Sequence, residues 1–189
     1  MSSRSNIIRA EIADVPMLRD QALAYIGIGS NIGVDDKQPQ HTLEQAFLAL
    51  ATLSALPLIV SSLWESQPID CPPDSPLFIN AVAALSPITQ DPHHLLSQLQ
   101  QIEQDFGRQR TGQRNAPRTL DLDLLSYAGI ECEDEVLCLP HPRLHQRAFV
   151  VFPLLEISPD YRDPSTSRPL RDVQSALAGQ GLRKLRKNA

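Results

Sequence analysis

Residues 118–125, with the sequence RTLDLDLL, alternate apolar and acidic side chains in the pattern of a β-strand. Because strand side chains point alternately to the two faces of a sheet, Asp121 and Asp123 share one face, with their Cα atoms about 6 to 7 Å apart. The leucines between them share the other face and can be buried in a core. The sequence therefore predicts a strand with one buried face and one acidic face, which looks into water, a cleft or a metal site.

The elements around this strand follow the order βαββαβ. The predicted strands are residues 22–29, 57–66, 77–85 and 118–125. One helix carries the apolar face of residues 43–50, and a second begins at Asp91-Pro92 and ends at Gly107. This order predicts an α+β fold with a ferredoxin-like βαββαβ core, in which an antiparallel sheet carries helices on one face. A C-terminal strand and helix extension follows, with a strand near residues 135–139 and helices near residues 144–157 and 170–179.

The length and charge of the chain limit what it can be. The chain has 189 residues, 42% of them apolar, and a formal net charge of -5. This length predicts a single domain over residues 22–180, with a loosely ordered N-terminal extension (residues 1–21) and a basic tail (residues 181–189). The interspersed charges argue against a general nucleic-acid binder, and no apolar run is long enough to span a bilayer.

The cysteines indicate the compartment. Cys71, Cys132 and Cys138 are odd in number, lack C-x-x-C spacing and accompany no secretory apolar segment. We therefore expect a reduced, cytoplasmic protein whose thiols are inert.

The aspartate pair lies directly behind a run of arginines. Paired carboxylates on rigid strand positions suit Mg²⁺, which takes its remaining ligands from water and phosphate oxygens. The arginines at positions 108, 110, 114 and 118 lie in a segment with enough glycine and proline to form a loop, and each offers a planar fork of donors to phosphate. Either feature alone is more often a solvated surface, but together they indicate phosphoryl transfer.

Two further segments supply candidate binding residues. Residues 139–149 (LPHPRLHQRAF) contain two histidines and two arginines, of which His141 is the better phosphate donor because prolines on both sides hold its backbone. In residues 77–82 (LFINAV), Phe78 and Asn80 share a strand face, so that a ring for stacking and an amide for pairing point the same way. From the residues alone, Phe149 fits the core better than a ligand site.

Four blocks of sequence together resemble the 6-hydroxymethyl-7,8-dihydropterin pyrophosphokinase family of the folate pathway. They are YIGIGSNIG, WESQPID followed by LFINAVAAL, GRQRTGQRNAPRTLDLDLLSY, and LPHPRLHQRAFVVFPLLEI. The resemblance runs from about Tyr25 to Pro159. It implies transfer of a diphosphate from ATP to the hydroxymethyl group of the reduced pterin, with attack on the β-phosphorus and release of AMP.

The resemblance also implies roles for individual residues. Asp121 and Asp123 would hold two Mg²⁺ ions and, with Arg108 and Arg118, form the catalytic group. The residues implied in ATP binding are Glu103, Arg108, Arg110, Arg118, His141 and Arg147. The residues implied in pterin binding are Ser66, Ile69, Phe78, Asn80 and Phe149. The chain departs from the family at two points. Some relatives have a tyrosine in place of Phe78. Relatives often have a tryptophan where this chain has Asn115-Ala116, in a loop thought to close over the substrates.

Other function classes remain open on the residues alone. A non-catalytic ferredoxin-like module could bind RNA or a small regulatory ligand, although an RNA-binding sheet should carry aromatic and basic side chains where this chain carries acid. A metal-dependent nuclease is the enzymatic alternative. We expect ATP and the pterin as small-molecule partners, without nucleic acid or membrane, and a monomer.

Overall fold

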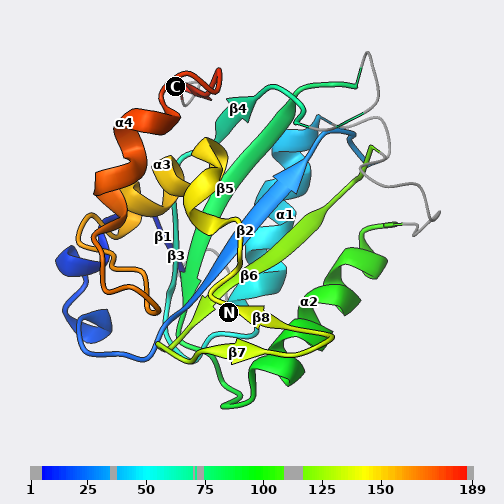
Figure 1. The fold of residues 1–189 in the computed structure, drawn as a ribbon. Coiled ribbons are helices and arrows are strands. Elements are labelled where there is room, and N and C mark those ends of the chain that lie inside the picture. Colours follow the sequence, from blue (N-terminus) through cyan, green and yellow to red (C-terminus); the bar gives the residue numbers. More distant parts are fainter. Residues whose placement is uncertain (1–5, 35–37, 70, 72–74, 109–116, 187–189) are drawn as a thin grey trace.

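A computed structural model describes residues 6–34, 38–69, 71, 75–108 and 117–186 of the chain. In these ranges the protein is an α+β fold with a mixed sheet and helices on both of its faces (Figure 1). The strands are β1 (Ile7–Ile8), β2 (Ala24–Ser30), β3 (Leu58–Val60), β4 (Trp64–Ser66), β5 (Phe78–Leu85), β6 (Asp121–Tyr127), β7 (Cys132–Glu133), β8 (Cys138–Leu139) and β9 (Arg183–Lys184). The α-helices are α1 (Pro39–Ala51), α2 (Pro92–Asp105), α3 (Ala148–Ile157) and α4 (Gln174–Leu177), and the 3₁₀ helices are η2 (Ile12–Asp14), η3 (Pro16–Leu18), η4 (Leu144–Gln146) and η5 (Leu170–Val173).

The main sheet has the strand order β1-β3-β5-β2-β6, and β4 pairs with both β5 and β9. The elements between residues 24 and 127 follow the expected order, except that residues 57–66 form two short strands, β3 and β4, instead of one. The expectation of an antiparallel sheet is wrong in one respect, because β1 runs parallel to β3. Every other pairing in this sheet of the described chain is antiparallel.

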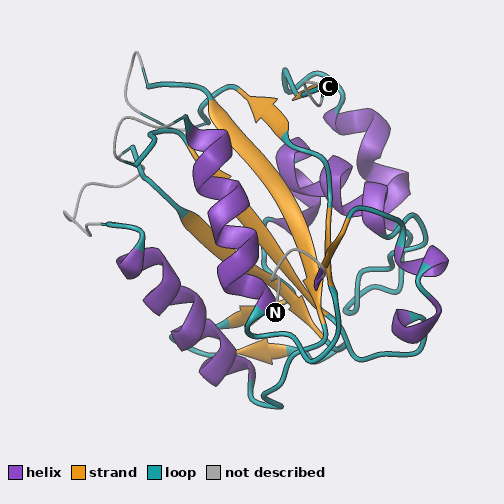
Figure 2. Ribbon diagram, turned by 180° about the vertical axis from the view of Figure 1, so that it is seen from behind, coloured by secondary structure: helices purple, strands orange, loops and turns teal. Residues whose placement is uncertain are grey.

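The sequence predicted that all helices lie on one face of the sheet. The structure shows helices on both faces. Helices α1 and α2 cover one face, where side chains such as Phe47 and Leu99 pack against alternate residues of β2, β5 and β6 (Figure 2). Helix α3 covers the opposite face, where it packs on Val82 and Leu125. Seven of its ten residues are buried, because α3 lies between the sheet and other segments of the same apolar cluster, including η5 and α4. In the described part of the chain, no helix combines the length and apolar character needed to cross a membrane.

The described part of the N-terminal extension, residues 6–21, is folded and corrects the expectation of loose order. Its strand β1 adds to the sheet edge beside β3, and Ile12, Val15 and Leu18 are buried in the same apolar cluster as α3. At the other end of the chain, β9 pairs with β4, so residues 183–184 of the expected basic tail belong to the sheet.

Strand β6 has the predicted alternation. Leu122 and Leu124 are buried against the α1 and α2 side, whereas Asp121 and Asp123 point to the α3 side. Leu125 also points to the α3 side and is fully buried there, after which a register shift against β2 turns Tyr127 to the α1 and α2 side. The acidic face is therefore open only at the start of β6, where α3 does not cover it.

Candidate functional site

A pocket of about 230 Å³ opens on the α3 face of the sheet, beside the first turn of α3. The residues that line it are Gly27, Ile28, Gly29, Ser66, Gln67, Ile69, Cys71, Phe78, Asn80, Ala81, Arg108, Arg118, Asp121, Asp123, His141, Arg143, Arg147, Phe149 and Val150. The pocket therefore joins segments that are more than a hundred residues apart in the sequence.

The sheet register sets the order of the pocket's polar groups. Gly29 of β2 lies directly between Asn80 of β5 and Asp121 of β6. Neighbouring strands are about 4.8 Å apart, so the amide and the carboxylate stem from backbones about 10 Å apart. A Cβ atom at Gly29 would lie 3.5 Å from Asn80 Oδ1 and 4.0 Å from Asp121 Cβ. The glycine thus leaves open the space between these two groups.

Arginines contact both aspartates. Asp121 Oδ1 lies 2.6 Å from Arg108 Nη1, and Asp121 Oδ2 accepts a hydrogen bond from Arg118 Nη1 at 2.8 Å. Asp123 Oδ2 accepts a hydrogen bond from Arg147 Nη1 at 3.1 Å. The two carboxylates keep 22% and 35% of their side-chain surface exposed, so a ligand can reach them from the pocket.

Burial is the main influence on the acidity of Asp121. Burial, followed by the charge of Asp123, raises the pKa of the Asp121 carboxyl above its ordinary value, although Arg118 and Arg108 oppose the shift. The two neighbouring carboxylates offer hard oxygen donors of the kind that a divalent cation such as Mg²⁺ takes.

Glu103 lies behind the pocket. It is 3% exposed, is absent from the pocket lining and contacts Arg108 through an ion pair. Its Oε1 atom also accepts a hydrogen bond of 2.7 Å from the backbone N–H of Leu122, on the edge strand β6. Desolvation raises the pKa of the Glu103 carboxyl, and the Leu122 N–H and Arg108 oppose that shift. In this arrangement Glu103 holds Arg108 beside Asp121.

His141 offers a hydrogen-bond donor to the pocket. Its backbone N–H donates to Leu125 O at 2.8 Å, which fixes the segment after β8 against β6. Its Nδ1 atom accepts from the backbone N–H of Arg143 at 3.1 Å, so the neutral ring carries its proton on Nε2. Burial lowers the pKa of His141, which favours the neutral form of the ring over the charged one.

The aromatic half of the pocket is built from β5 and α3. Phe78 and Phe149 come from these two elements, and the Arg147 guanidinium lies 5.5 Å from the centre of the Phe149 ring. Asn80 is 4% exposed, and its Nδ2 donates to Ser66 Oγ at 3.0 Å. Ser66 thereby fixes the orientation of the amide, whose Oδ1 faces Gly29.

Most of the residues singled out in the sequence meet in this pocket. Ser66, Ile69, Phe78, Asn80 and Phe149 line it, as do Arg108, Arg118, Asp121, Asp123, His141 and Arg147. Glu103 does not. Arg110, Arg114 and the Asn115-Ala116 pair lie outside the described residues, and with them most of the expected closing loop.

Several residues that line the pocket have no role predicted from the sequence. Gly27 and Gly29 carry a signal in the sequence, since glycine inside a strand often marks a close approach of a ligand. Gln67, Cys71 and Val150 carry no such signal, because only their place in the fold brings them to the pocket.

The comparisons with known proteins agree with this geometry. A family model described as 7,8-dihydro-6-hydroxymethylpterin-pyrophosphokinase (HPPK) matches residues 25–159. The chain is 40% identical over 144 residues to a 2-amino-4-hydroxy-6-hydroxymethyldihydropteridine pyrophosphokinase from Haemophilus influenzae, covering 76% of this chain and 86% of that protein. It is 38% identical over 162 residues to the folic acid synthesis protein fol1 of Schizosaccharomyces pombe, covering 85% of this chain but only 21% of that protein.

A solved structure supports the fold. The crystal structure of Plasmodium falciparum HPPK-DHPS wild type with SDX-DHP matches with a TM-score of 0.60 at 13% identity, covering 83% of this chain and 44% of that chain. The present chain thus spans less than half of the solved chain and about a fifth of fol1, but most of the bacterial relative.

Proposed function

The chain belongs to the 7,8-dihydro-6-hydroxymethylpterin-pyrophosphokinase family, and we propose that the pocket beside α3 is where it transfers a diphosphate from ATP to the hydroxymethyl group of the dihydropterin. This pyrophosphokinase reaction belongs to folate biosynthesis. One observation carries the proposed site: a single pocket brings together the aspartate pair, the arginines, and the ring and amide of β5. Membership of the family argues against the RNA-binding, regulatory and nuclease alternatives.

Asp121 and Asp123 are the residues that would hold Mg²⁺, and two ions are expected from the family resemblance. Bound Mg²⁺ would supply positive charge that neutralises the triphosphate and would act as a Lewis acid. The position of both carboxylates on one face of β6, open to the same pocket, supports this role.

The arginines and His141 act on the triphosphate. Arg108, Arg118 and Arg147 donate to phosphate oxygens, and His141 adds a neutral N–H donor from the same side of the pocket. The arginine charges and the His141 N–H stabilise the transition state. In that step the hydroxymethyl oxygen forms a bond to the β-phosphorus. The bond between the β-phosphorus and the oxygen that joins it to the α-phosphate breaks, and AMP leaves. The hydroxyl proton is lost in the same reaction.

The pterin occupies the β5 and α3 side of the pocket. Phe78 and Phe149 supply rings for stacking on its flat bicycle, and Asn80 pairs with its polar edge. Ser66 acts through Asn80, while Ile69, which is exposed, contributes an apolar rim. Glu103 acts through Arg108 instead of contacting the nucleotide directly, because its carboxylate is buried behind that side chain.

We extend the proposal to the organisation of the chain. Residues 24–127 form a ferredoxin-like core with β1 added at its edge, within a single catalytic domain over residues 22–180. The enzyme works as a cytoplasmic monomer on small molecules, without nucleic acid or membrane.

The test is a product assay by mass spectrometry with ATP, Mg²⁺ and 6-hydroxymethyl-7,8-dihydropterin. We expect AMP and the pterin diphosphate in equal amounts, with product formation lost in Asp121→Asn and retained in Glu44→Gln, a variant of an exposed residue on α1. ADP with a pterin monophosphate would overturn the reaction, and full activity of Asp121→Asn would overturn the site.

A further inference from the structure

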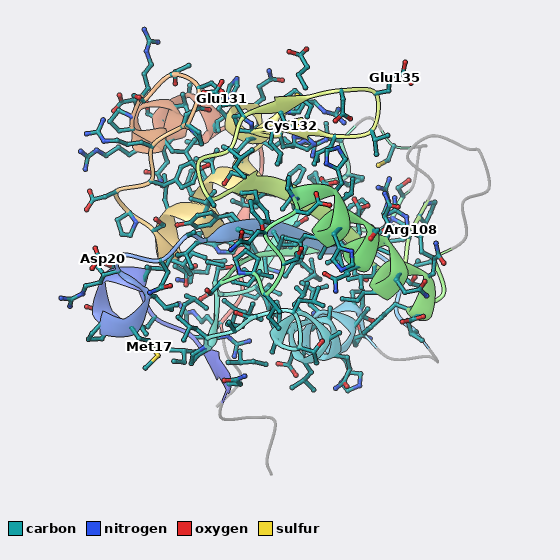
Figure 3. The ribbon with its side chains drawn as sticks, turned by 90° about the horizontal axis from the view of Figure 1, so that it is seen from below. Met17, Asp20, Arg108, Glu131, Cys132 and Glu135 are labelled. Atoms are coloured by element: carbon teal, nitrogen blue, oxygen red, sulfur yellow. The ribbon has the colours of Figure 1, made fainter. Side chains whose placement is uncertain are left out.

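A second group of metal-ligating side chains lies away from the pocket, between the first turn of α2 and the β7–β8 hairpin. It consists of His93 on α2, Cys132 on β7 and Asp134 in the turn that follows. Their ligand atoms all lie within 4.8 Å of one another. In Figure 3, Cys132 lies on the hairpin, between Glu131 and Glu135, whereas Arg108 follows the far end of α2.

We propose that His93, Cys132 and Asp134 form a zinc site that ties the β7–β8 hairpin to α2. The side-chain types decide the metal, because an imidazole, a thiolate and a carboxylate together suit Zn²⁺, whereas Mg²⁺ and Ca²⁺ take oxygen ligands. The site goes beyond the pyrophosphokinase reaction and does not depend on it.

Two of the three distances between ligand atoms lie near those of a zinc site, and the third, between His93 and Cys132, is within 4.8 Å. His93 Nε2 lies 2.8 Å from Asp134 Oδ2, and Cys132 Sγ lies 3.4 Å from the same oxygen. Ligand atoms around a tetrahedral zinc ion are about 3.3 to 3.7 Å apart, given bonds of about 2.0 to 2.3 Å. The ion therefore requires the His93–Asp134 contact to open by less than about 1 Å. Both side chains are more than two-fifths exposed, so they can rotate this far and leave a fourth position to water.

Backbone hydrogen bonds already orient one of the ligands. Asp134 Oδ1 accepts from the backbone N–H groups of Val136 and Leu137, both at 2.8 Å, and this directs Oδ2 toward His93 and Cys132. His93 Nδ1 lies 3.6 Å from Asp91 Oδ1, and Asp91 in turn caps α2 by accepting from His93 N. This distance is longer than a hydrogen bond, so Asp91 would have to approach the ring to support a metal-bound histidine.

This arrangement distinguishes the cluster from an ordinary surface ion pair. A His–Asp pair alone would need neither the thiol nor the carboxylate at the second nitrogen. Cys132 therefore has a role that its sequence context does not predict, since an odd number of cysteines without C-x-x-C spacing is typical of inert thiols.

The experiment measures metal binding by the reduced full-length protein. Excess Mg²⁺ is present to occupy the proposed Mg²⁺ ligands Asp121 and Asp123. Zn²⁺ affinity is measured by competition with a chromophoric chelator, and Co²⁺ is used to detect a thiolate-to-metal charge-transfer band that an aspartate site cannot give. The site variants are Cys132→Ser and His93→Gln. Their matched controls are Cys138→Ser on the paired strand and His94→Gln on the same helix turn.

We expect one Zn²⁺ per chain, a Co²⁺ thiolate band in the parent protein, and an affinity at least ~10-fold weaker in each site variant, since even outer-shell changes cost ~10 to 100-fold. The control variants should match the parent. Circular dichroism of the variants checks that they fold. An absent band, zinc binding unchanged in Cys132→Ser, or an equal loss in Cys138→Ser would each overturn the site.

Discussion

Replacing Glu103 by glutamine tests whether this buried carboxylate acts through Arg108. The substitution keeps the shape of the side chain and an oxygen that can accept from the Leu122 N–H, but it removes the charge that Arg108 contacts. A hydrogen bond to a charged group contributes about 1.5 to 3 kcal/mol, and this is the expected loss in free energy of unfolding. At about 2 to 4 °C per kcal/mol for a chain of this size, Tm should fall by roughly 3 to 12 °C.

A double-mutant cycle with Arg108→Ala separates the two roles of Glu103. If Glu103 only holds Arg108, Glu103→Gln lowers ATP affinity up to ~10-fold in the parent, about 1.4 kcal/mol, and has no effect once Arg108 is gone. The effect of Glu103→Gln on the free energy of unfolding should also change sign in the Arg108→Ala background. Arg108→Ala leaves the buried charge of Glu103 unpaired, and Glu103→Gln then removes that charge.

The assay is calorimetric titration of a non-hydrolysable ATP analogue with Mg²⁺, together with thermal unfolding, on the four proteins of the cycle. Glu44→Gln, at an exposed position of α1, is the control for loss of one negative charge. A further loss of ATP affinity from Glu103→Gln in the Arg108→Ala background would refute the positioning role and place Glu103 in direct contact with nucleotide.

Three other changes test separate parts of the molecule. Asp123→Asn should reduce turnover at least ~10²-fold with the fold intact, since one ligand of the proposed Mg²⁺ site is lost, and near-normal rates would refute that assignment. Asn80→Ala should weaken pterin binding by about 1 to 3 kcal/mol while leaving ATP binding unchanged; equal losses for both ligands in calorimetry would place Asn80 elsewhere. Burial alone would raise the pKa of Glu156, but hydrogen bonds from Ser62 and Trp64 and the Lys184 ammonium lower it overall. The ionised Glu156 carboxylate therefore stabilises the fold above its ordinary pKa of 4.5. This stabilisation is lost as pH falls through the lower pKa of the folded state. Glu156→Gln should therefore be less stable at pH 7 and lose less stability than the parent on acidification below pH 4.5, and parallel unfolding curves would contradict this.

The sequence predicted the strand with the two aspartates because leucine and aspartate alternate without exception over residues 120–124. One face of the strand is therefore apolar and the other is acidic. Leu122 and Leu124 are buried on one side, and the acids open to the pocket on the other. Phe78 and Asn80 were found by the same rule of alternation. The roles assigned to them remain predictions, which rest on the family resemblance and on their position in the pocket.

The errors have physical causes that a pattern of hydrophobicity does not contain. Strand β1 has only two residues, too few for a periodicity, and the residues after it are buried through isolated side chains such as Leu18. Helix α3 is apolar almost all round, which is the mark of a helix covered on both sides, but the βαββαβ order suggested helices on one face. The contact between Glu103 and Leu122 depends on β6 being the edge strand, and this follows only from the complete sheet order.

The sheet register explains why two substrates can meet in so small a pocket. Asn80, Gly29 and Asp121 lie side by side on three neighbouring strands, with the amide proposed to bind the pterin at one end and the proposed metal ligand at the other. Gly29 carries no side chain, so the surface between them is bare backbone, over which the hydroxymethyl group and the β-phosphorus can approach. Gly27, the next residue of β2 on this face, lies opposite Asp123 and extends the same bare surface toward α3. The two glycines make β2 the floor of the pocket, and β5 and β6 its two functional sides.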